Sequence, residues 1–196
     1  KKIFTNKAKW KDGDTYPKIT IITVVKNGEK FLEETIQSVI NQTYKNFEYI
    51  IIDGYSNDNT SLIVKKYRKN INLYLMSKDK NMWDAMNKGI HYANGSIVVF
   101  LNSDDTFNKK ALSYAAKYFV RDKQLDFLFG TVKKHWLKYG FYPTRAYWSF
   151  DFYTTHSIGF FIKKRSQLKI GNYNINFLSA DLDLFLRMIL KFKLKG

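Results

Sequence analysis

Four nearly continuous runs of apolar residues constrain this chain more than any other feature. They are residues 18–25, 47–53, 71–76 and 96–101, the first of which reads KITIITVV. Strands that are buried on both faces have this character, and such strands occur in parallel sheets. Apolar residues at helical spacing predict helices between the runs, at residues 29–41, 61–69 and 84–93. The alternation predicts an α/β fold with a mostly parallel central sheet flanked by helices.

The remaining parts of the chain are less regularly patterned. Residues 1–16 are polar and basic without periodicity, so we interpret them as an N-terminal arm. Beyond the fourth run we expect helices at residues 108–120 and 179–191, and strands at 125–129, 132–139 and 158–162. Residues 140–160 are dense in aromatic side chains. The abrupt end at Gly196 allows a longer natural chain.

Composition excludes several classes of protein. The 196 residues fit one domain, and 45% of them are hydrophobic, which is enough for a core. The absence of Cys excludes a disulfide scaffold, a Cys-ligated metal and a Cys nucleophile. No apolar run approaches the ~20 residues of a membrane span. The net charge of +16 favours anionic partners: nucleic acid, an acidic bilayer or phosphorylated small molecules.

Polar side chains collect where the predicted strands end. Four of them are Asn27, Asp53, Ser77 and Asp104. Ligands of open α/β sheets bind beyond these carboxyl ends. Asp104 and Asp105 form an adjacent pair of carboxylates, and such oxygen ligands suit Mg²⁺ or Mn²⁺. The alternative interpretation is that the pair caps the helix that follows.

Three stretches of the sequence resemble the inverting glycosyltransferases of family 2, which have the GT-A (Rossmann-like) fold. ITIITVVKNGEKFLEETIQSVINQTYKNFEYIIIDGYSNDNT is similar to the opening block of that family. SKDKNMWDAMNKGIHYANGSIVVFLNSDD is similar to a subgroup with a D-A-x-N-K-G helix and a closing N-x-D-D. GNYNINFLSADLDLFLRM resembles the acceptor-side segment. The resemblance covers about residues 18–190.

The resemblance implies a nucleotide-diphosphate-sugar donor, with UDP as its nucleotide. Asp53 stands where the family reads the nucleobase, and Asp84 where it holds the base or ribose. Asn102-Ser103-Asp104 takes the place of a D-x-D motif, which makes Asp104 the implied ligand of Mn²⁺ or Mg²⁺. Asp105 is then a supporting carboxylate. The further donor-binding residues that we expect are Val25, Lys88, Asn102 and Ser103.

Two positions depart from the family's pattern. Asn102 replaces the first Asp of D-x-D, which keeps a hydrogen-bond acceptor but removes a charge. Met86 occupies a position that is often Arg, so we expect Lys88 or Lys80 to supply the cation for the diphosphate.

On the acceptor side, the resemblance implies that Asp181 is the general base, with Asp183 as its rival. Two residues apart on a helix, the two side chains point about 200° apart, so only one is expected to face the cleft. The alternative for both is a favourable interaction with the helix N-terminus. We place His156 and Trp148 on the acceptor side, and interpret residues 140–155 as a candidate lid.

Within one domain, we expect residues 17–107 to form the nucleotide-sugar-binding half and residues 108–196 a smaller acceptor-side region. The chain is therefore interpreted as a metal-dependent, inverting glycosyltransferase with a saccharide or lipid-linked acceptor in cell-surface polysaccharide synthesis. Three alternatives remain open. They are a single-stranded nucleic-acid-binding module, favoured by charge and aromatic content, a metal-dependent nucleotidyl- or phosphotransferase, and a family member that binds the donor but has lost transfer. No nucleic-acid motif supports the first. The basic charge also favours a cytoplasmic enzyme with peripheral contact to an anionic membrane.

Overall fold

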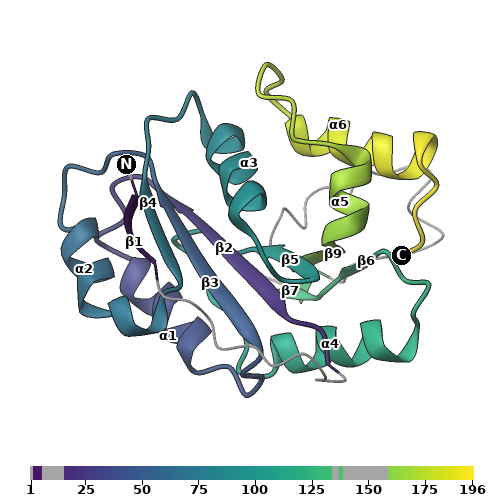
Figure 1. Cartoon of the computed structure of the whole chain (residues 1–196), viewed down its shortest axis with the longest axis horizontal. Coiled ribbons are helices and arrows are strands. Elements are labelled where there is room, and N and C mark those ends of the chain that lie inside the picture. Colours follow the sequence, from purple (N-terminus) through teal and green to yellow (C-terminus); the bar gives the residue numbers. More distant parts are fainter. Residues whose placement is uncertain (1, 6–15, 134–136, 139–158) are drawn as a thin grey trace.

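A single mixed sheet forms the centre of the molecule in the computed structural model, which describes residues 2–5, 16–133, 137–138 and 159–196 (Figure 1). Its seven strands lie in the order β1-β4-β3-β2-β5-β9-β6. They are β1 (Lys2–Thr5), β2 (Ile19–Val25), β3 (Phe47–Asp53), β4 (Leu73–Met76), β5 (Ile97–Phe100), β6 (Phe127–Phe129) and β9 (Phe160–Lys163). Two further short strands, β7 (Val132–Lys133) and β8 (Leu137–Lys138), pair with each other.

Strand direction confirms the predicted mostly parallel sheet. The four apolar runs form strands β4, β3, β2 and β5. These strands pair in parallel. Strand β9 is inserted antiparallel between β5 and β6, which gives β6 the direction of β5. Strand β1 pairs antiparallel with β4. The sheet is therefore extended on both sides of a parallel centre.

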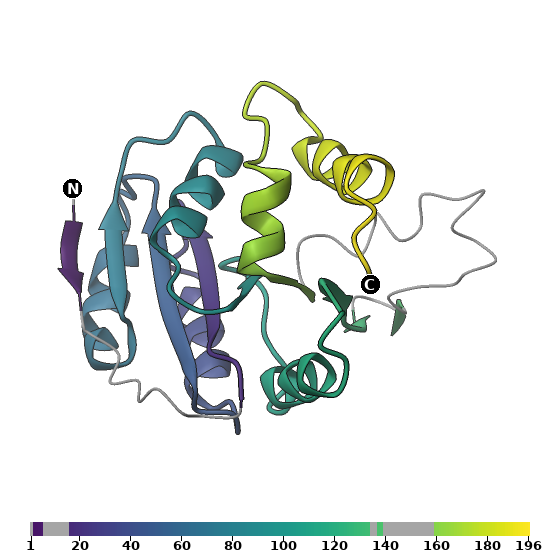
Figure 2. The ribbon, with the colours of Figure 1, turned by 45° about the vertical axis from the view of Figure 1, so that its right-hand side comes forward.

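Helices cover both faces of the sheet, because each strand is apolar on both sides (Figures 1 and 2). One core lies under α1 (Leu32–Ile40), α2 (Thr60–Lys66) and α4 (Ala111–Arg121). The other lies under α3 (Met82–Tyr92), α5 (Lys164–Ile170) and α6 (Ala180–Leu186). Short helical turns follow α2 at Arg68–Asn70 and α6 at Arg187–Lys191. The result is three layers.

Four elements differ from the sequence predictions. Residues 132–139, expected as one strand, contain the two short paired strands β7 and β8. Lys2–Thr5, which we expected within a patternless arm, forms the edge strand β1, because β4 offers an unpaired edge. Helix α5 was not predicted. Helix α3 begins at Met82 rather than Asp84, because the Asn81 side chain caps it by accepting a hydrogen bond from Asp84 N.

Helix α3 lies directly against β2, and Gly89 makes this approach possible. A Cβ atom at this position would come 2.4 Å from Cγ2 of Ile22, which is fully buried on β2. Any side chain here would force the helix away from the sheet. The close approach matters because α3 carries Asp84, Asn87 and Lys88 to the edge where the strands end.

Candidate active site

Hydrogen bonds join the loops that follow β2 and β3 at the carboxyl ends of the strands. In the parallel register Val25 lies opposite Asp53. Beyond it, Asn27 adopts a left-handed backbone with φ of 53°, a conformation that Asn tolerates. Asn27 N donates to Ser56 Oγ at 2.8 Å, and Asn27 Oδ1 accepts from Asn57 N at 3.0 Å. These bonds fix the rim next to the site.

Asp53 is fully buried within this rim. Its Oδ1 accepts from Ser56 N at 2.8 Å, and its Oδ2 accepts from the Tyr74 hydroxyl at 2.5 Å. Burial, together with the bond to Asp53, raises the pKa of Tyr74. In this conformation Asp53 therefore shapes the loop, and its direct contact with a nucleobase stays a prediction.

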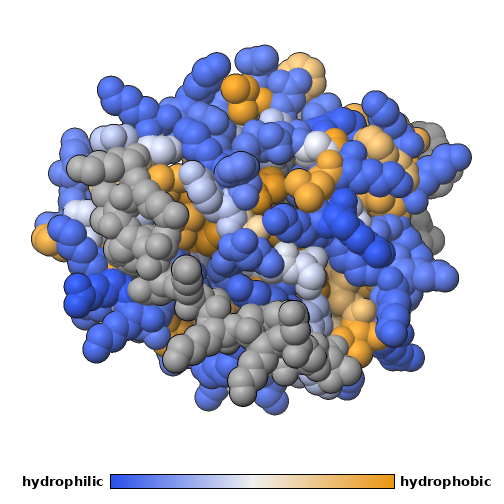
Figure 3. All heavy atoms as spheres, viewed as in Figure 1, coloured by the Kyte–Doolittle hydropathy of each residue, from blue (hydrophilic) through white to orange (hydrophobic). Residues whose placement is uncertain are grey.

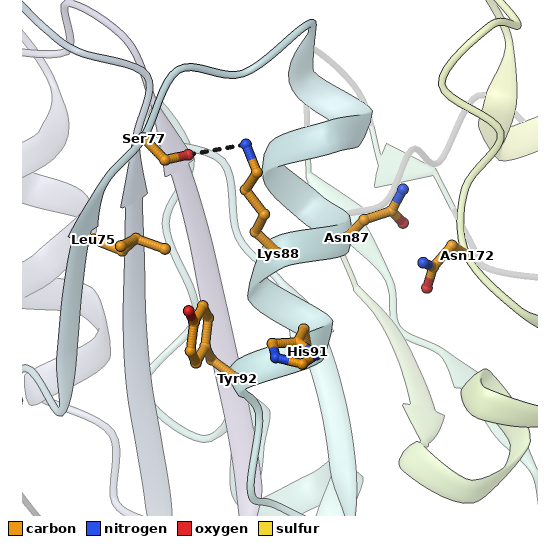
Figure 4. A pocket seen from close by; sticks show the side chains of 7 residues that line it. All are labelled: Leu75, Ser77, Asn87, Lys88, His91, Tyr92 and Asn172. Atoms are coloured by element: carbon orange, nitrogen blue, oxygen red, sulfur yellow. Dashed lines mark hydrogen bonds between the residues drawn. The ribbon is translucent and has the colours of Figure 1, made fainter. Parts of the chain in front are cut away.

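A network centred on Lys88 occupies the rim after β4. Figure 4 shows Lys88 reaching from α3 to the Ser77 hydroxyl, at 3.1 Å. The ammonium group also bonds Asp79 Oδ1 at 2.5 Å and Asp84 Oδ2 at 3.1 Å, and the carbonyl of Lys78 at 3.0 Å. An ammonium has three N–H donors, so these four acceptors use all of them. In this conformation the donors of Lys88 are engaged within the protein, and the binding of the diphosphate by Lys88 or Lys80 stays a prediction.

Asp84 and Lys88 favour each other's charged form. Partial burial alone would raise the pKa of Asp84, but hydrogen bonds from Lys80 N and Lys88 lower it overall. Burial likewise would lower the pKa of Lys88, yet Asp79 and Asp84 raise it. Such mutual stabilisation favours a network that is charged at neutral pH.

A hollow of about 360 Å³ opens beside this network. Its lining combines apolar surface with two exposed lysines at the mouth. The lining residues are Val24, Val25, Lys26, Gly54, Asp79, Lys80, Asn81, Met82 and Ala85. A second hollow, of about 400 Å³, is lined by Lys88, His91 and Tyr92 among other residues (Figure 4). The first hollow contains Val25, one of the predicted donor-binding residues.

The predicted metal-binding segment forms a turn after β5. Asp105 N donates to the carbonyl of Asn102 at 3.2 Å, which closes the turn. The hydroxyl of buried Thr35 on α1 then donates to the carbonyls of Ser103 and Asp105, at 3.0 and 2.8 Å. Fixed in this way, the turn leaves Asp104 exposed and Asn102 partly exposed.

The donor set of this turn fits Mg²⁺ or Mn²⁺. Asn102, Asp104 and Asp105 offer amide and carboxylate oxygens, which are the ligands that these ions prefer. Among the described residues no group of three His, Cys, Asp or Glu side chains gathers into a complete metal site. A catalytic Mg²⁺ usually takes only one or two carboxylates and fills its shell with substrate phosphates.

The two acidic candidates on α6 have different partners. Asp183 forms an ion pair with Arg187 at 2.8 Å. Arg187 also donates to the carbonyls of Ile170 and Asn172, so Asp183 belongs to a structural clamp. Asp181, partly exposed, has no ion pair with any residue that the structure describes. Because Asp183 is paired with Arg187, these contacts favour Asp181 over Asp183 as the candidate general base.

Two aromatic side chains join α3 to the segment that leads into α6. Burial of Tyr173, reinforced by the charge of Asp181, raises the pKa of the Tyr173 hydroxyl. Tyr173 in turn stacks on Trp83 of α3, with ring centroids 5.3 Å apart. Trp83 lies between Met82 and Ala85, two residues that line the hollow. The acceptor-side helix and the hollow are thus parts of one packed unit.

Two predicted residues, His156 and Trp148, lie outside the described residues, as does the candidate lid at 140–155. Conversely, sequence reasoning missed Asn87, Arg187 and Asp79 as residues of the site. The only sequence signal for Asn87 was its place in the D-A-M-N-K-G helix. Nothing in the sequence pattern indicated that Asp79 would be buried.

Comparison with known proteins assigns the chain to a family. Residues 20–192 match the family described as "Glycosyl transferase family 2", and the chain belongs to this family. It is 32% identical over 115 residues to the putative teichuronic acid biosynthesis glycosyltransferase TuaG of Bacillus subtilis, covering 57% of this chain and 42% of TuaG. It is 27% identical over 189 residues to an uncharacterised glycosyltransferase of Methanocaldococcus jannaschii. This match covers 88% of this chain and 65% of the relative. The chain thus spans less than two thirds of these relatives' lengths.

Solved structures share the GT-A fold. The mannosyltransferase PcManGT from Pyrobaculum calidifontis, in complex with GDP-Man and Mn²⁺, matches with a TM-score of 0.71 and 18% identity over 89% of this chain and 52% of its own. Staphylococcus aureus TarS with UDP matches with a TM-score of 0.71 and 20% identity. The match covers 87% of this chain and 54% of the TarS chain. TarS with UDP-GlcNAc matches with 30% identity and a TM-score of 0.55. This match covers 59% of this chain and 34% of the TarS chain. Among the described residues no helix is long and apolar enough to cross a membrane.

Proposed function

We propose that this chain is an inverting, metal-dependent glycosyltransferase that moves a sugar from a UDP-sugar to a saccharide or lipid-linked acceptor in cell-surface polysaccharide synthesis. The observation that carries the proposal is the exposed carboxylate of Asp104 on a fixed turn at the rim where the strands end. The uridine assignment draws on TarS, whose structures hold UDP and UDP-GlcNAc. TuaG is named for teichuronic acid biosynthesis and TarS as a poly(ribitol-phosphate) β-N-acetylglucosaminyltransferase, and both names support a polymeric acceptor.

In the proposed reaction, Asp181 accepts the proton of the acceptor hydroxyl as its oxygen attacks the anomeric carbon. The bond from that carbon to the diphosphate breaks, and the nucleoside diphosphate leaves with the electron pair. Attack from the opposite face inverts the anomeric configuration. Asn102, Asp104 and Asp105 would hold the divalent ion, which when bound neutralises charge on the diphosphate. Lys26 and Lys80, two exposed residues that line the hollow, would bind the same anion.

Calorimetric titration tests the donor site first. UDP is titrated into the protein with Mn²⁺ and again with EDTA, and both titrations are repeated on Asp104→Ala. The expected result is micromolar binding that requires both Mn²⁺ and Asp104. The matched control is Asp122→Asn, which changes an exposed carboxyl on the surface after α4 and should bind like the wild type. Equal binding in EDTA, or by the Asp104 variant, would contradict the metal assignment.

We also propose peripheral contact with an anionic membrane at the cytoplasmic face. Hydrophilic residues cover much of the face seen in Figure 3, in line with the net charge of +16. On the C-terminal segment, Leu190 is 69% exposed and is followed by exposed Lys191 and Lys193. Basic residues next to an anionic surface contribute roughly 1 kcal/mol each. Flotation should therefore recover the protein with vesicles that contain anionic lipid and not with neutral vesicles.

A further inference from the structure

Asp79 has a carboxylate oxygen that no residue in the described part of the chain binds. The Asp79 side chain is only 7% exposed. Its Oδ1 accepts from the Ser77 hydroxyl and from Lys88, each at 2.5 Å. Its Oδ2 is buried, and no hydrogen-bond donor among the described residues reaches it. A buried carboxylate oxygen without a donor is costly, so a ligand that supplies one is favoured at this position.

The surroundings of Oδ2 indicate where that donor would come from. Asp79 lines the hollow of about 360 Å³ together with Val24, Val25 and Ala85, which offer apolar surface. Gly54 lies next to Oδ2. A Cβ atom on Gly54 would be 3.5 Å from Asp79 Oδ2. The stem of exposed Lys26 also lies against Gly54 and can move aside. A flat, mostly apolar ring with an N–H at its edge fits this combination.

We propose that Asp79 is a specificity-determining residue that accepts a hydrogen bond from a nucleobase N–H next to a carbonyl, as in uracil N3–H or guanine N1–H. The inference rests on the proposed function and adds the residue that selects the base. Cytosine presents a lone pair at the same edge, which a carboxylate repels. Asp53, by contrast, has both oxygens bonded within the protein and no exposed surface.

Lys88 is the positioning residue for this contact. It holds Oδ1 by an ion pair and so fixes the orientation of the carboxylate, which lines the hollow. Asp84, which also binds Lys88, fixes the ammonium from the other side. A neutral or rotated Asp79 would not discriminate between an N–H and a lone pair.

The substitution Asp79→Asn converts this prediction into a change of specificity. The amide oxygen must take the place of Oδ1, because Ser77 and Lys88 both donate there. The amide NH₂ then occupies the place of Oδ2, which turns an acceptor into a donor. A donor opposes uracil N3–H and matches the lone pair of cytosine N3. Loss of one charge-assisted hydrogen bond corresponds to at least about tenfold in affinity.

The experiment is calorimetric titration of UDP, GDP, CDP and the diphosphate of 3-methyluridine, with Mn²⁺, into the whole chain. The wild type should bind UDP or GDP at least about tenfold more tightly than CDP, and methylation of N3 should abolish the preference for UDP. Asp79→Asn should weaken binding of the preferred nucleotide at least about tenfold and bind CDP as well or better. Asp122→Asn serves as the control and should match the wild type.

A second variant covers the case in which Asp79→Asn does not fold. Gly54 has no left-handed backbone, and a Cβ there would make only ordinary contacts of 3.5 and 3.6 Å, so Gly54→Ala should melt at the wild-type temperature. Its methyl group fills the space beside Oδ2 and should weaken UDP binding at least about tenfold. If both variants bind UDP as tightly as the wild type, the role of Asp79 is wrong, while the proposed function is unaffected. A wild type that binds none of these nucleotides would overturn the proposed function with it.

Discussion

The side chain of Asn87 forms both hydrogen bonds that the backbone of Tyr173 offers. Asn87 Oδ1 accepts from Tyr173 N, and Asn87 Nδ2 donates to Tyr173 O, each at 2.9 Å. Asn81 adds a third bond, from its Nδ2 to the carbonyl of Ile175. Helix α3 is thereby joined to the segment that leads into α6, and the hollow and Asp181 are held in one arrangement.

Removing this connection should destabilise the chain. Asn87→Ala leaves the N–H and the carbonyl of Tyr173 without partners, and we expect a loss of about 2 kcal/mol in the free energy of unfolding. Urea denaturation followed by circular dichroism measures it. Asn59→Ala is the matched control, because Asn59 is exposed and its side chain makes no cap hydrogen bond. A loss no larger than that of the control would show that the contact does not join the two halves.

Asp181 and Asp183 should separate into a chemical and a structural role. Asp181→Asn should reduce sugar transfer by roughly 10²- to 10⁴-fold and leave UDP binding unchanged, because only the proton acceptor is lost. Asp183→Asn should instead lower the free energy of unfolding by about 1 kcal/mol, because it breaks the pair with Arg187. Turnover per folded molecule, with calorimetry for binding, distinguishes them. Full turnover by the Asp181 variant would assign the base elsewhere.

Gly89 offers a test of the packing between α3 and β2. In an exposed helix, Gly→Ala stabilises by up to about 1 kcal/mol. Here the new Cβ would meet Ile22 Cγ2 at 2.4 Å, so we expect Gly89→Ala to destabilise by about 1–3 kcal/mol. In the background of Ile22→Ala, which removes the obstructing methyl, the same change should be much less harmful. A stabilising effect in the wild-type background would mean that the helix stands off the sheet.

The network around Lys88 predicts a pH dependence of stability. The folded protein lowers the pKa of Asp84, so its contribution is complete above the unfolded-state pKa and is lost as the pH falls through the folded value. Asp84→Asn should therefore lower the free energy of unfolding by about 1 kcal/mol at neutral pH and lose less of it on acidification. Urea denaturation at a series of pH values between neutrality and about pH 3 measures this. Parallel curves for the two proteins would contradict the coupling.

Much of the fold could be predicted because the signal is local. The four apolar runs became β2, β3, β4 and β5, since a strand without a polar face can only lie in the middle of a layered sheet. The position of Asp104 after such a strand already indicated a rim residue. Strands β1 and β9 could not be placed in the same way, because antiparallel addition depends on which edges the rest of the chain leaves open.

The sequence by itself determined the family, the layered α/β architecture and the candidate carboxylates, because strand burial, helix spacing and the motifs are properties of neighbouring residues. Only the tertiary structure decided how those carboxylates are used. Asp183 pairs with Arg187 and Asp53 bonds Tyr74, whereas one oxygen of Asp79 has no partner among the described residues, although the three look alike in sequence. The reason is physical: the state of a carboxylate depends on burial and on donors brought from distant segments, which only the folded chain supplies.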